Sequence, residues 1–275
     1  MGITRDRICL YTPSHPFRRS MTDIIKCAAE LGLGGVEFRS FCEELREPDR
    51  KVAKALGQQT RLLGLKIPCF SVPCDFVSDA EGALKRLREY AEICSDLEIP
   101  YLHHTVAYAF DYDISEEERE RRFQLCIEPS LAICEYAARL GVRTLIEDQR
   151  YVFNGVENCE RLCELSSGRI GVVADVGNIF FMDQAPQDFI HGMGKRIVHA
   201  HVKDFMRCET EPEVYQYRSR SGAYLSSAEI GKGIVDLGAV KRAFEDISYG
   251  GVFSLEFSRV ADDKEVVRVL QRILD

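Results

Sequence analysis

Short apolar runs alternate along the whole chain with longer segments in which apolar residues recur every three or four positions. The short runs predict eight strands, at residues 8–11, 35–38, 66–72, 101–106, 144–147, 171–175, 197–202 and 252–257. The longer segments predict helices, because that spacing places the apolar residues on one helical face. One such face consists of Leu84, Leu87, Ala91 and Cys94, and the next consists of Phe123, Ile127, Leu131, Cys134 and Ala138.

Residues that favour helix ends stand at the boundaries of these segments. Ser115 is followed by three glutamates, which is typical of a helix N-cap with an acidic first turn. Gly32, Gly64 and Gly141 each follow a leucine, where a glycine can end a helix in the left-handed conformation. A predicted strand begins shortly after each glycine, so the end signals agree with the periodicity.

Eight strand-helix repeats with apolar strands predict a parallel sheet covered by helices. Eight strands in a chain of 275 residues favour a closed (β/α)₈ TIM barrel, with residues 1–275 forming a single α/β domain. An open, doubly wound sheet is the alternative, but no G-x-G-x-x-G opens the first helix. Residues 205–230 are polar and lack a clear period, which predicts a long loop after the seventh strand.

Composition narrows the classes of partner. The chain has 36 Lys and Arg against 44 Asp and Glu, a net charge of −8, which counts against nucleic acid as the main partner. No apolar stretch predicts a signal peptide or a membrane span. The 11 cysteines are scattered without a C-x-x-C motif, which favours reduced thiols in a cytoplasmic protein.

Ionisable residues stand late in four successive predicted strands, at the end where a TIM barrel builds its chemistry. They are Glu147, Asp175, His201 and Glu256. Charges inside apolar strands are costly unless they are paired or bound to a metal. Three carboxylates around one imidazole leave an excess of negative charge that one divalent cation would neutralise. The oxygen-rich set suits Mn²⁺ or Mg²⁺ better than Zn²⁺ or Co²⁺.

The motifs around these residues resemble those of the xylose-isomerase-like TIM barrel superfamily of sugar isomerases and epimerases. They are LIED at Glu147, DVGN at Asp175, HVKD at His201, GKGIVD at residues 231–236 and SLEF at Glu256. DVGN and HVKD followed by GKGIVD are most similar to ketose 3-epimerases, and inosose dehydratases share much of the pattern. The resemblance implies that the four residues hold one divalent ion and that Glu147 and Glu256 act as an acid-base pair.

The chemistry of the residues is compatible with that expectation. Removing a proton next to a ketone creates an enediolate, which a chelated metal stabilises. Inversion at carbon needs a carboxylate on each face of the substrate, as Glu147 and Glu256 would supply. The main hypothesis is therefore a metal-dependent isomerase or epimerase acting on a small sugar or sugar phosphate.

Three alternatives stay open at this point. A metal-dependent dehydratase of the inosose or dehydroshikimate type would need only one base and a different acid. An apurinic endonuclease is disfavoured by the net charge and by Asn178, which stands where many relatives have a histidine. A catalytically dead binding barrel is disfavoured because all four expected ligands are present. By analogy with its relatives, the chain is expected to form a homo-oligomer, a dimer or a tetramer.

Other polar residues are candidates for binding the substrate. Lys203 alternates to the face of His201, where it would bind a substrate oxygen or phosphate or pair with a rim acid. The resemblance places Arg207 on substrate oxygens, with a surface arginine as the alternative. Asn178 is able to hydrogen-bond a substrate hydroxyl. His103 and His104 end the fourth strand, where alternation lets only one of them point inward.

Some candidates have an equally simple structural alternative. Glu37 ends the second strand and would bind substrate hydroxyls or pair with Arg39. His15 and Phe17 could cover the site or pack locally. Aromatic residues of the later loops could stack on a sugar or pack on their own loops; these are Phe110, Tyr112, Tyr215, Tyr217 and Tyr224.

Overall fold

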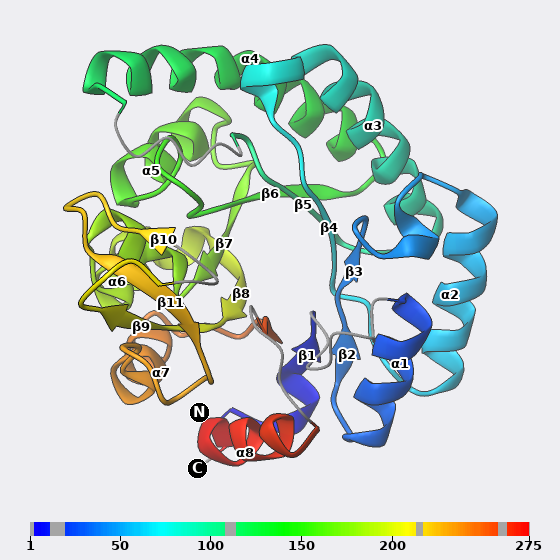
Figure 1. Cartoon of the computed structure of the whole chain (residues 1–275). Helices are drawn as coiled ribbons and strands as arrows, with labels where there is room; N and C mark the ends of the chain where they lie inside the picture. Colours follow the sequence, from blue (N-terminus) through cyan, green and yellow to red (C-terminus); the bar gives the residue numbers. More distant parts are fainter. Residues whose placement is uncertain (1–2, 12–19, 108–113, 213–216, 258–262, 275) are drawn as a thin grey trace.

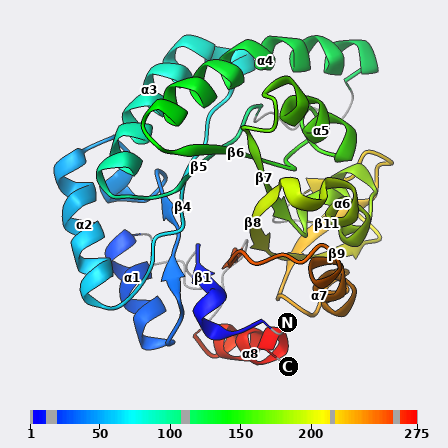
Figure 2. The same cartoon turned by 180° about the vertical axis from the view of Figure 1, so that it is seen from behind.

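Nine parallel strands form one sheet that curls into a nearly closed barrel, with helices on its outside (Figures 1 and 2). The computed structural model describes residues 3–11, 20–107, 114–212, 217–257 and 263–274. The strands of the barrel are β1 (Ile8–Leu10), β2 (Gly35–Val36), β3 (Phe38–Arg39), β4 (Cys69–Val72), β5 (Tyr101–His104), β6 (Arg143–Glu147), β7 (Gly171–Asp175), β8 (Ile197–Val202) and β12 (Phe253–Leu255).

Neighbouring strands lie in the order β2-β1-β12-β8-β7-β6-β5-β4-β3, and every neighbouring pair is parallel. The two end strands, β2 and β3, are consecutive in the chain with only Glu37 between them. The second predicted strand is therefore present as two short pieces, and eight predicted strands become nine. The TIM barrel expectation is confirmed and the open-sheet alternative is wrong.

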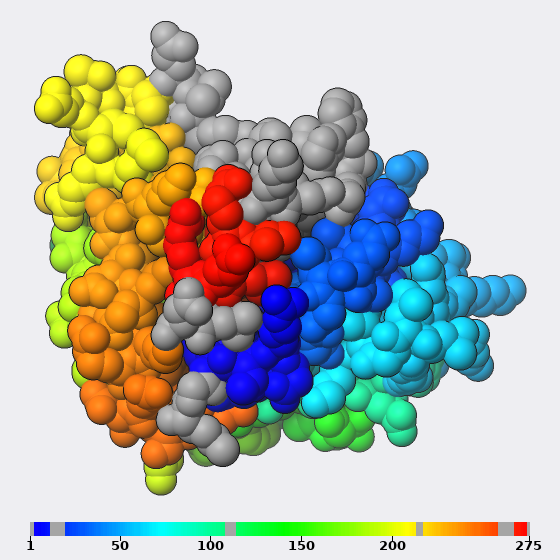
Figure 3. All heavy atoms as spheres, turned by 90° about the horizontal axis from the view of Figure 1, so that it is seen from below, coloured from blue at the N-terminus to red at the C-terminus, as the bar shows by residue number. Residues whose placement is uncertain are grey.

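The helices follow the predicted alternation. They are α1 (Met21–Glu30), α2 (Arg50–Leu62), α3 (Phe76–Asp96), α4 (Glu116–Arg139), α5 (Val156–Leu165), α6 (Pro186–Met193), α7 (Leu237–Asp246) and α8 (Asp263–Leu274). Figure 3 shows α8, in red, lying between the N-terminal segment and the orange segment of the chain. None of the helices within the described residues is both long enough and apolar enough to cross a membrane.

The predicted helix ends have the expected geometry. The Ser115 side chain accepts a hydrogen bond from the backbone N–H of Glu118, as an N-cap does. Gly32, Gly64 and Gly141 have φ angles of 63°, 74° and 76°, which is the left-handed region that ends a helix.

The predicted apolar faces are only partly correct. In α3, Leu87, Ala91 and Cys94 are buried and Leu84 is half-buried. In α4, Phe123 and Cys134 are buried, but Ala138 is exposed. The buried face of α4 is rotated and includes Cys126, Ile133 and Ala137, because α4 packs against α3 as well as against the sheet.

The segment predicted as a long loop after β8 instead contains a small antiparallel sheet. Its strands lie in the order β10-β11-β9, with β9 at Asp204–Cys208, β10 at Tyr217–Arg218 and β11 at Tyr224–Ala228. Phe205 and Leu225 are buried in this sheet and pack in one cluster with Phe181 and Tyr151. The sequence does not predict these strands, because the sheet buries few apolar residues and the segment therefore contains no clear apolar run.

Candidate active site

The four residues singled out at the strand ends converge at one mouth of the barrel. Glu147 ends β6, Asp175 ends β7, His201 lies near the end of β8 and Glu256 follows β12. These strands are neighbours and parallel, so their carboxyl ends meet at the same rim. Each residue offers one ligand atom, and the four atoms all lie within 4.8 Å of one another.

His201 is the centre of the cluster. Its Nδ1 lies 2.7 Å from Oε1 of Glu147, 3.4 Å from Oε2 of Glu256 and 4.0 Å from Oδ2 of Asp175. Burial alone would lower the pKa of His201, yet the negative charges and hydrogen bonds of Glu37, Glu147 and Glu256 raise it well above its ordinary value. The imidazole thus carries part of the charge that balances the carboxylates.

Lys203 carries another part of that charge. Its Nζ lies 2.8 Å from Oδ2 of Asp175 and 3.0 Å from Oε1 of Glu256. The alternative that Lys203 pairs with a rim acid is therefore realised, with two members of the cluster rather than with Asp204. The Asp204 carboxylate instead accepts hydrogen bonds from the backbone N–H groups of Gly231, Gly233 and Val235, which holds the GKGIVD segment in place.

The carboxylates crowd one another despite these cations. Burial, together with the charges of Glu147 and Glu256, raises the pKa of Asp175 to about 7, although Lys203 acts in the opposite direction. Burial would also raise the pKa of Glu256, but Lys203 and His201 hold it at about 2. Excess negative charge in a buried space is what a bound cation relieves.

The donor set fits a divalent metal ion. Three carboxylate oxygens and one imidazole nitrogen form an oxygen-rich set that suits hard divalent cations. The Nδ1 atom of His201 faces the three carboxylates, and its other nitrogen is turned toward Glu37. A cation bound here would displace the proton from Nδ1, since only a neutral imidazole ligates metal.

A cavity of about 430 Å³ lies against the cluster, in the size range of small-molecule sites. Glu147, Glu256 and Lys203 line it, so both glutamates of the cluster are accessible from the cavity. Asn178 lines it as well, which places this residue where it can contact a ligand.

The two neighbouring histidines of β5 point in opposite directions. His103 lines the cavity, with Nδ1 2.7 Å from the Ser71 hydroxyl and Nε2 3.9 Å from Oε2 of Glu147. His104 is not part of the cavity lining; its Nδ1 donates to the carbonyl of Thr105 and its ring packs against Phe76. Burial lowers the pKa of both histidines to about 4, so both are neutral near pH 7.

Two other substrate-binding candidates lie away from the cavity. Arg207 lies on β9 with an exposed side chain and is not among the residues of the cavity wall, so the surface alternative describes it. Glu37 is fully buried and hydrogen-bonds His199 and His201, so it neither lines the cavity nor pairs with Arg39. The guanidinium of Arg39 instead donates to the sulfur of Cys42.

The cavity wall includes residues that the sequence analysis did not single out. The Tyr11 ring stacks on His201, with 4.6 Å between ring centroids, and Arg150 lines the wall from the loop after β6. Tyr11 directly follows β1, so the strand-end rule that found Glu147 would have found it too. Further aromatic side chains complete the wall; they are Phe41, Phe181, Phe205 and Phe257.

The remaining loop aromatics contribute little to the described cavity. Tyr217 lines it and also packs against Phe181 and Phe205, so both alternatives stay open for this residue, whereas Tyr224 lies in β11 and is absent from the wall. The other candidates for covering the site lie outside the described residues; these are His15, Phe17, Phe110, Tyr112 and Tyr215.

The family model described as "Xylose isomerase-like TIM barrel" matches residues 25–274, and the chain belongs to this family. Among solved structures, D-psicose 3-epimerase from Clostridium cellulolyticum H10 is 15% identical, with a TM-score of 0.75 over 98% of this chain and 97% of that one. The probable 3-DHS dehydratase AsbF from Bacillus anthracis is 17% identical, with a TM-score of 0.76 over 98% and 99%.

A third solved structure has the same extent of similarity. The 3-keto-D-glucoside 4-epimerase from E. coli is 15% identical, with a TM-score of 0.74 over 97% of this chain and 98% of that one. Identities this low establish a shared fold and leave the reaction of this chain open. A comparison with curated proteins gives no significant match.

Proposed function

We propose that the protein is a divalent-metal-dependent isomerase or epimerase of a sugar or sugar phosphate. The observation that carries the proposal is the joint position of Glu147 and Glu256. Both carboxylates line the same cavity, and both also reach the Nδ1 atom of His201, where the donor set fits a cation. A substrate ketone oxygen at this position would have a carboxylate within reach of its neighbouring carbon.

In this mechanism the chain itself supplies orientation and proton transfer. One of the two glutamates removes the proton next to the ketone, and the other returns a proton, to the opposite face in an epimerase. When bound, Mn²⁺ or Mg²⁺ would polarise the ketone and stabilise the negative charge that develops on its oxygen. Asn178 and the neutral His103 line the same cavity and would hydrogen-bond the substrate hydroxyls.

Unequal surroundings of the two glutamates support a second candidate, a metal-dependent dehydratase. Lys203 lies 3.0 Å from Glu256, while Glu147 contacts His201 through Oε1 and has the neutral His103 3.9 Å from Oε2. A dehydratase needs one base and a separate acid that protonates the departing hydroxyl. Glu147 would be that base, and the Lys203 ammonium beside Glu256 would be that acid.

Arg150 bears on whether the substrate is phosphorylated. Its side chain lines the cavity, and its backbone has a φ of 62°, a left-handed conformation that non-glycine residues adopt mostly where the surrounding structure enforces it. A guanidinium binds phosphate or carboxylate oxygens in a bidentate manner. We therefore expect substrates that carry an anionic group to be preferred over their neutral counterparts.

The test is proton exchange in heavy water. Candidate ketoses and their phosphates are incubated with the Mn²⁺-loaded protein, and NMR shows which carbon exchanges its hydrogen and which product forms. Exchange with an isomerised or epimerised product supports the proposal. A product with a conjugated double bond and its ultraviolet absorption would assign the protein to the dehydratases instead, and nicking of abasic duplex DNA would overturn both.

Arg150→Lys serves as a matched variant in the same assay, because it keeps the charge and removes the bidentate geometry. A larger increase of KM for the phosphorylated ketose than for the free ketose is expected. An equal effect on both would contradict the role given to Arg150.

A further inference from the structure

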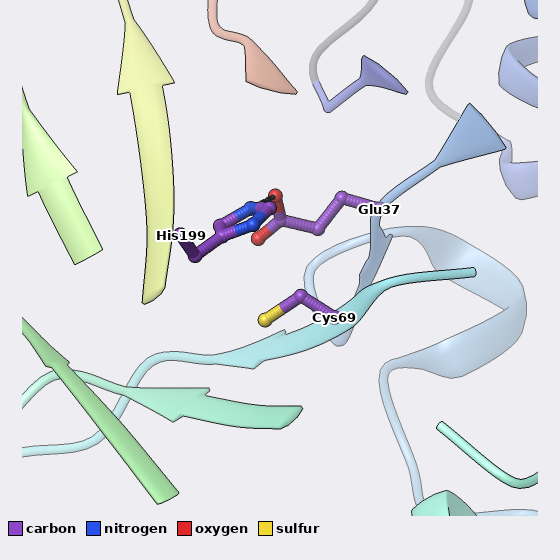
Figure 4. A group of neighbouring side chains, drawn as sticks. All are labelled: Glu37, Cys69 and His199. Atoms are coloured by element: carbon purple, nitrogen blue, oxygen red, sulfur yellow. Dashed lines mark hydrogen bonds and ion pairs between the residues drawn. The ribbon is translucent and has the colours of Figure 1, made fainter. Parts of the chain in front are cut away.

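A second polar cluster lies inside the barrel next to the candidate metal centre. It consists of Glu37, Cys69 and His199, from the break between β2 and β3, from β4 and from β8, and all three are fully buried (Figure 4). Figure 4 shows the Glu37 carboxylate facing the His199 ring. A buried carboxylate is costly unless its partners compensate for the lost water, so its contacts need an explanation.

Glu37 is held by three side chains from two strands. Its Oε2 lies 2.7 Å from Nε2 of His199, and both of its oxygens lie 3.1 Å from Nε2 of His201. The hydroxyl of Ser71 donates to Oε1. The carboxylate therefore joins β4 to β8 across the barrel interior and touches the metal-facing histidine from the side opposite the cavity.

This contact determines which nitrogen of His201 is available to a cation. Without a cation, both nitrogens of His201 face carboxylates and both carry a hydrogen. A bound cation would displace the hydrogen on Nδ1, and because an ionised carboxylate only accepts hydrogen bonds, Glu37 keeps the hydrogen on Nε2. The lone pair then belongs to Nδ1, which faces Glu147, Asp175 and Glu256. Without Glu37, either nitrogen could carry the hydrogen and the ring could rotate. Carboxylates that fix a ligating histidine in this way commonly change metal affinity about 10–100-fold.

We propose that Glu37 is the positioning residue of the metal centre, holding His201 in the Nε2–H tautomer and aiming its Nδ1 at the three carboxylates. Ser71 and His199 hold Glu37 in turn. The inference rests on the proposed metal site and is independent of which sugar reaction the protein performs.

A competing assignment would make Glu37, Cys69 and His199 the ligands of a metal ion of their own. The contacts of this cluster argue against a bound metal ion. They have hydrogen-bond lengths, and serine hydroxyls contact both Glu37 and His199. Ser71 donates to Glu37, and the Ser254 hydroxyl lies 3.1 Å from Nε2 of His199. Polar partners already surround the carboxylate, so a cation is not needed to stabilise it.

The first experiment measures Mn²⁺ affinity by isothermal titration of the metal-free full chain, with no substrate present. Glu37→Gln is expected to weaken binding about 10–100-fold while circular dichroism stays unchanged. Cys69→Ala is the matched control, since it alters the same buried cluster but not the contact with His201, and it should bind Mn²⁺ as the wild type does. Equal affinity of Glu37→Gln and the wild type would overturn the proposal, as would two ions per wild-type chain.

A second measurement avoids the risk that Glu37→Gln fails to fold. Nitrogen-15 NMR of the wild-type protein loaded with Mg²⁺ reports the tautomer of His201 directly. A proton on Nε2 is the expected result, and a proton on Nδ1 contradicts the proposal. Loss of sugar turnover with normal Mn²⁺ binding would refute the proposed reaction and leave the role of Glu37 standing, whereas a wild-type chain that binds no divalent cation would refute both.

Discussion

Glu147 and Glu256 are chemically identical residues in different surroundings at the mouth of the barrel. Burial alone would raise the pKa of Glu147, but the hydrogen bond and charge of His201 bring it below its ordinary value. Glu256 has Lys203 in addition and a more exposed side chain, at 19% against 3% for Glu147. Both are therefore ionised near pH 7, so either can accept the proton of the substrate, and the glutamate that returns a proton must first take one up from solvent.

Replacing either glutamate with glutamine should abolish turnover. Glu147→Gln and Glu256→Gln keep the side-chain volume but remove a proton acceptor, which is worth about 10²–10⁴-fold in rate. Steady-state kinetics with the substrate found by deuterium exchange gives the loss, and bound Mn²⁺ is measured alongside to separate catalysis from metal binding. Unchanged turnover in one of the variants would remove that glutamate from the acid-base pair.

His104 allows a test at a residue outside the candidate site. Its pKa is lowered to about 4 by burial, whereas an unfolded histidine titrates near 6.5, so the unfolded chain binds more protons between those values. The free energy of unfolding should therefore be fully maintained above about pH 6.5 and should fall as the pH decreases toward 4.

The contribution of His104 is a few kcal/mol at most, about 1.4 per pKa unit. Urea unfolding of the wild type and of His104→Gln across this range measures it. The variant should show a smaller loss of stability on acidification, because its side chain does not titrate. Parallel curves for the two proteins would contradict the assignment of His104 as a buried neutral histidine.

The sequence predicts which side chains converge at the strand ends, but it does not predict which side chains contact each other across the barrel. The converging set of Glu147, Asp175, His201 and Glu256 follows from their positions in successive parallel strands. The partners of Glu37 do not follow from sequence, because His199 lies 162 residues away and no local pattern relates the two. The inward direction of His103 depends on strand twist and register, which alternation alone leaves undetermined.

At the level of elements, burial explains which predictions succeed. Strands covered on both sides are continuous apolar runs, so all eight were located. The division of the second strand at Glu37 was missed, because a polar residue with buried partners stands where an apolar side chain is expected. The sheet of β9, β10 and β11 was taken for a loop because it buries few apolar residues. Its position depends on the turn around Gly233.

Gly233 should not tolerate a side chain. A Cβ atom there would lie 2.0 Å from the carbonyl oxygen of Phe205 and 2.2 Å from Oδ1 of Asp204, the carboxylate that holds this turn. Gly233→Ala is expected to destabilise the protein by about 1–3 kcal/mol and to reduce turnover, because Lys203 immediately precedes Asp204.

Thermal unfolding and kinetics of this variant are compared with Gly250→Ala. A Cβ atom at Gly250 meets nothing within 4 Å, and its φ is not in the left-handed region, so that control should resemble the wild type. Equal stability of Gly233→Ala and Gly250→Ala would show that the turn accommodates a Cβ atom without destabilising the protein.

At the scale of the whole molecule, the barrel assembles a site that no single segment contains. Three carboxylates enter from β6, β7 and the end of β12, and the imidazole enters from β8. Burial and the repulsion of Glu147 and Glu256 raise the pKa of Asp175 to about 7, which is a cost of closing the barrel that Lys203 and His201 partly offset. A ligand that relieves this repulsion should stabilise the entire fold, because it binds only when all four strands are in place.

Removal of divalent metal should therefore lower both activity and thermal stability, and Mn²⁺ should restore them together. At a free Mn²⁺ concentration of 100 times Kd the expected gain is about 2.7 kcal/mol, or roughly 5–10 °C in Tm for a chain of this size. Differential scanning calorimetry with and without a chelator measures it, and elemental analysis confirms the metal content. Asp175→Asn, which removes one ligand charge with little change in shape, should show a much smaller Mn²⁺-dependent shift. Full activity of a verified metal-free preparation would contradict a resident cation, and an equal shift in Asp175→Asn would place the cation at a different site in the chain.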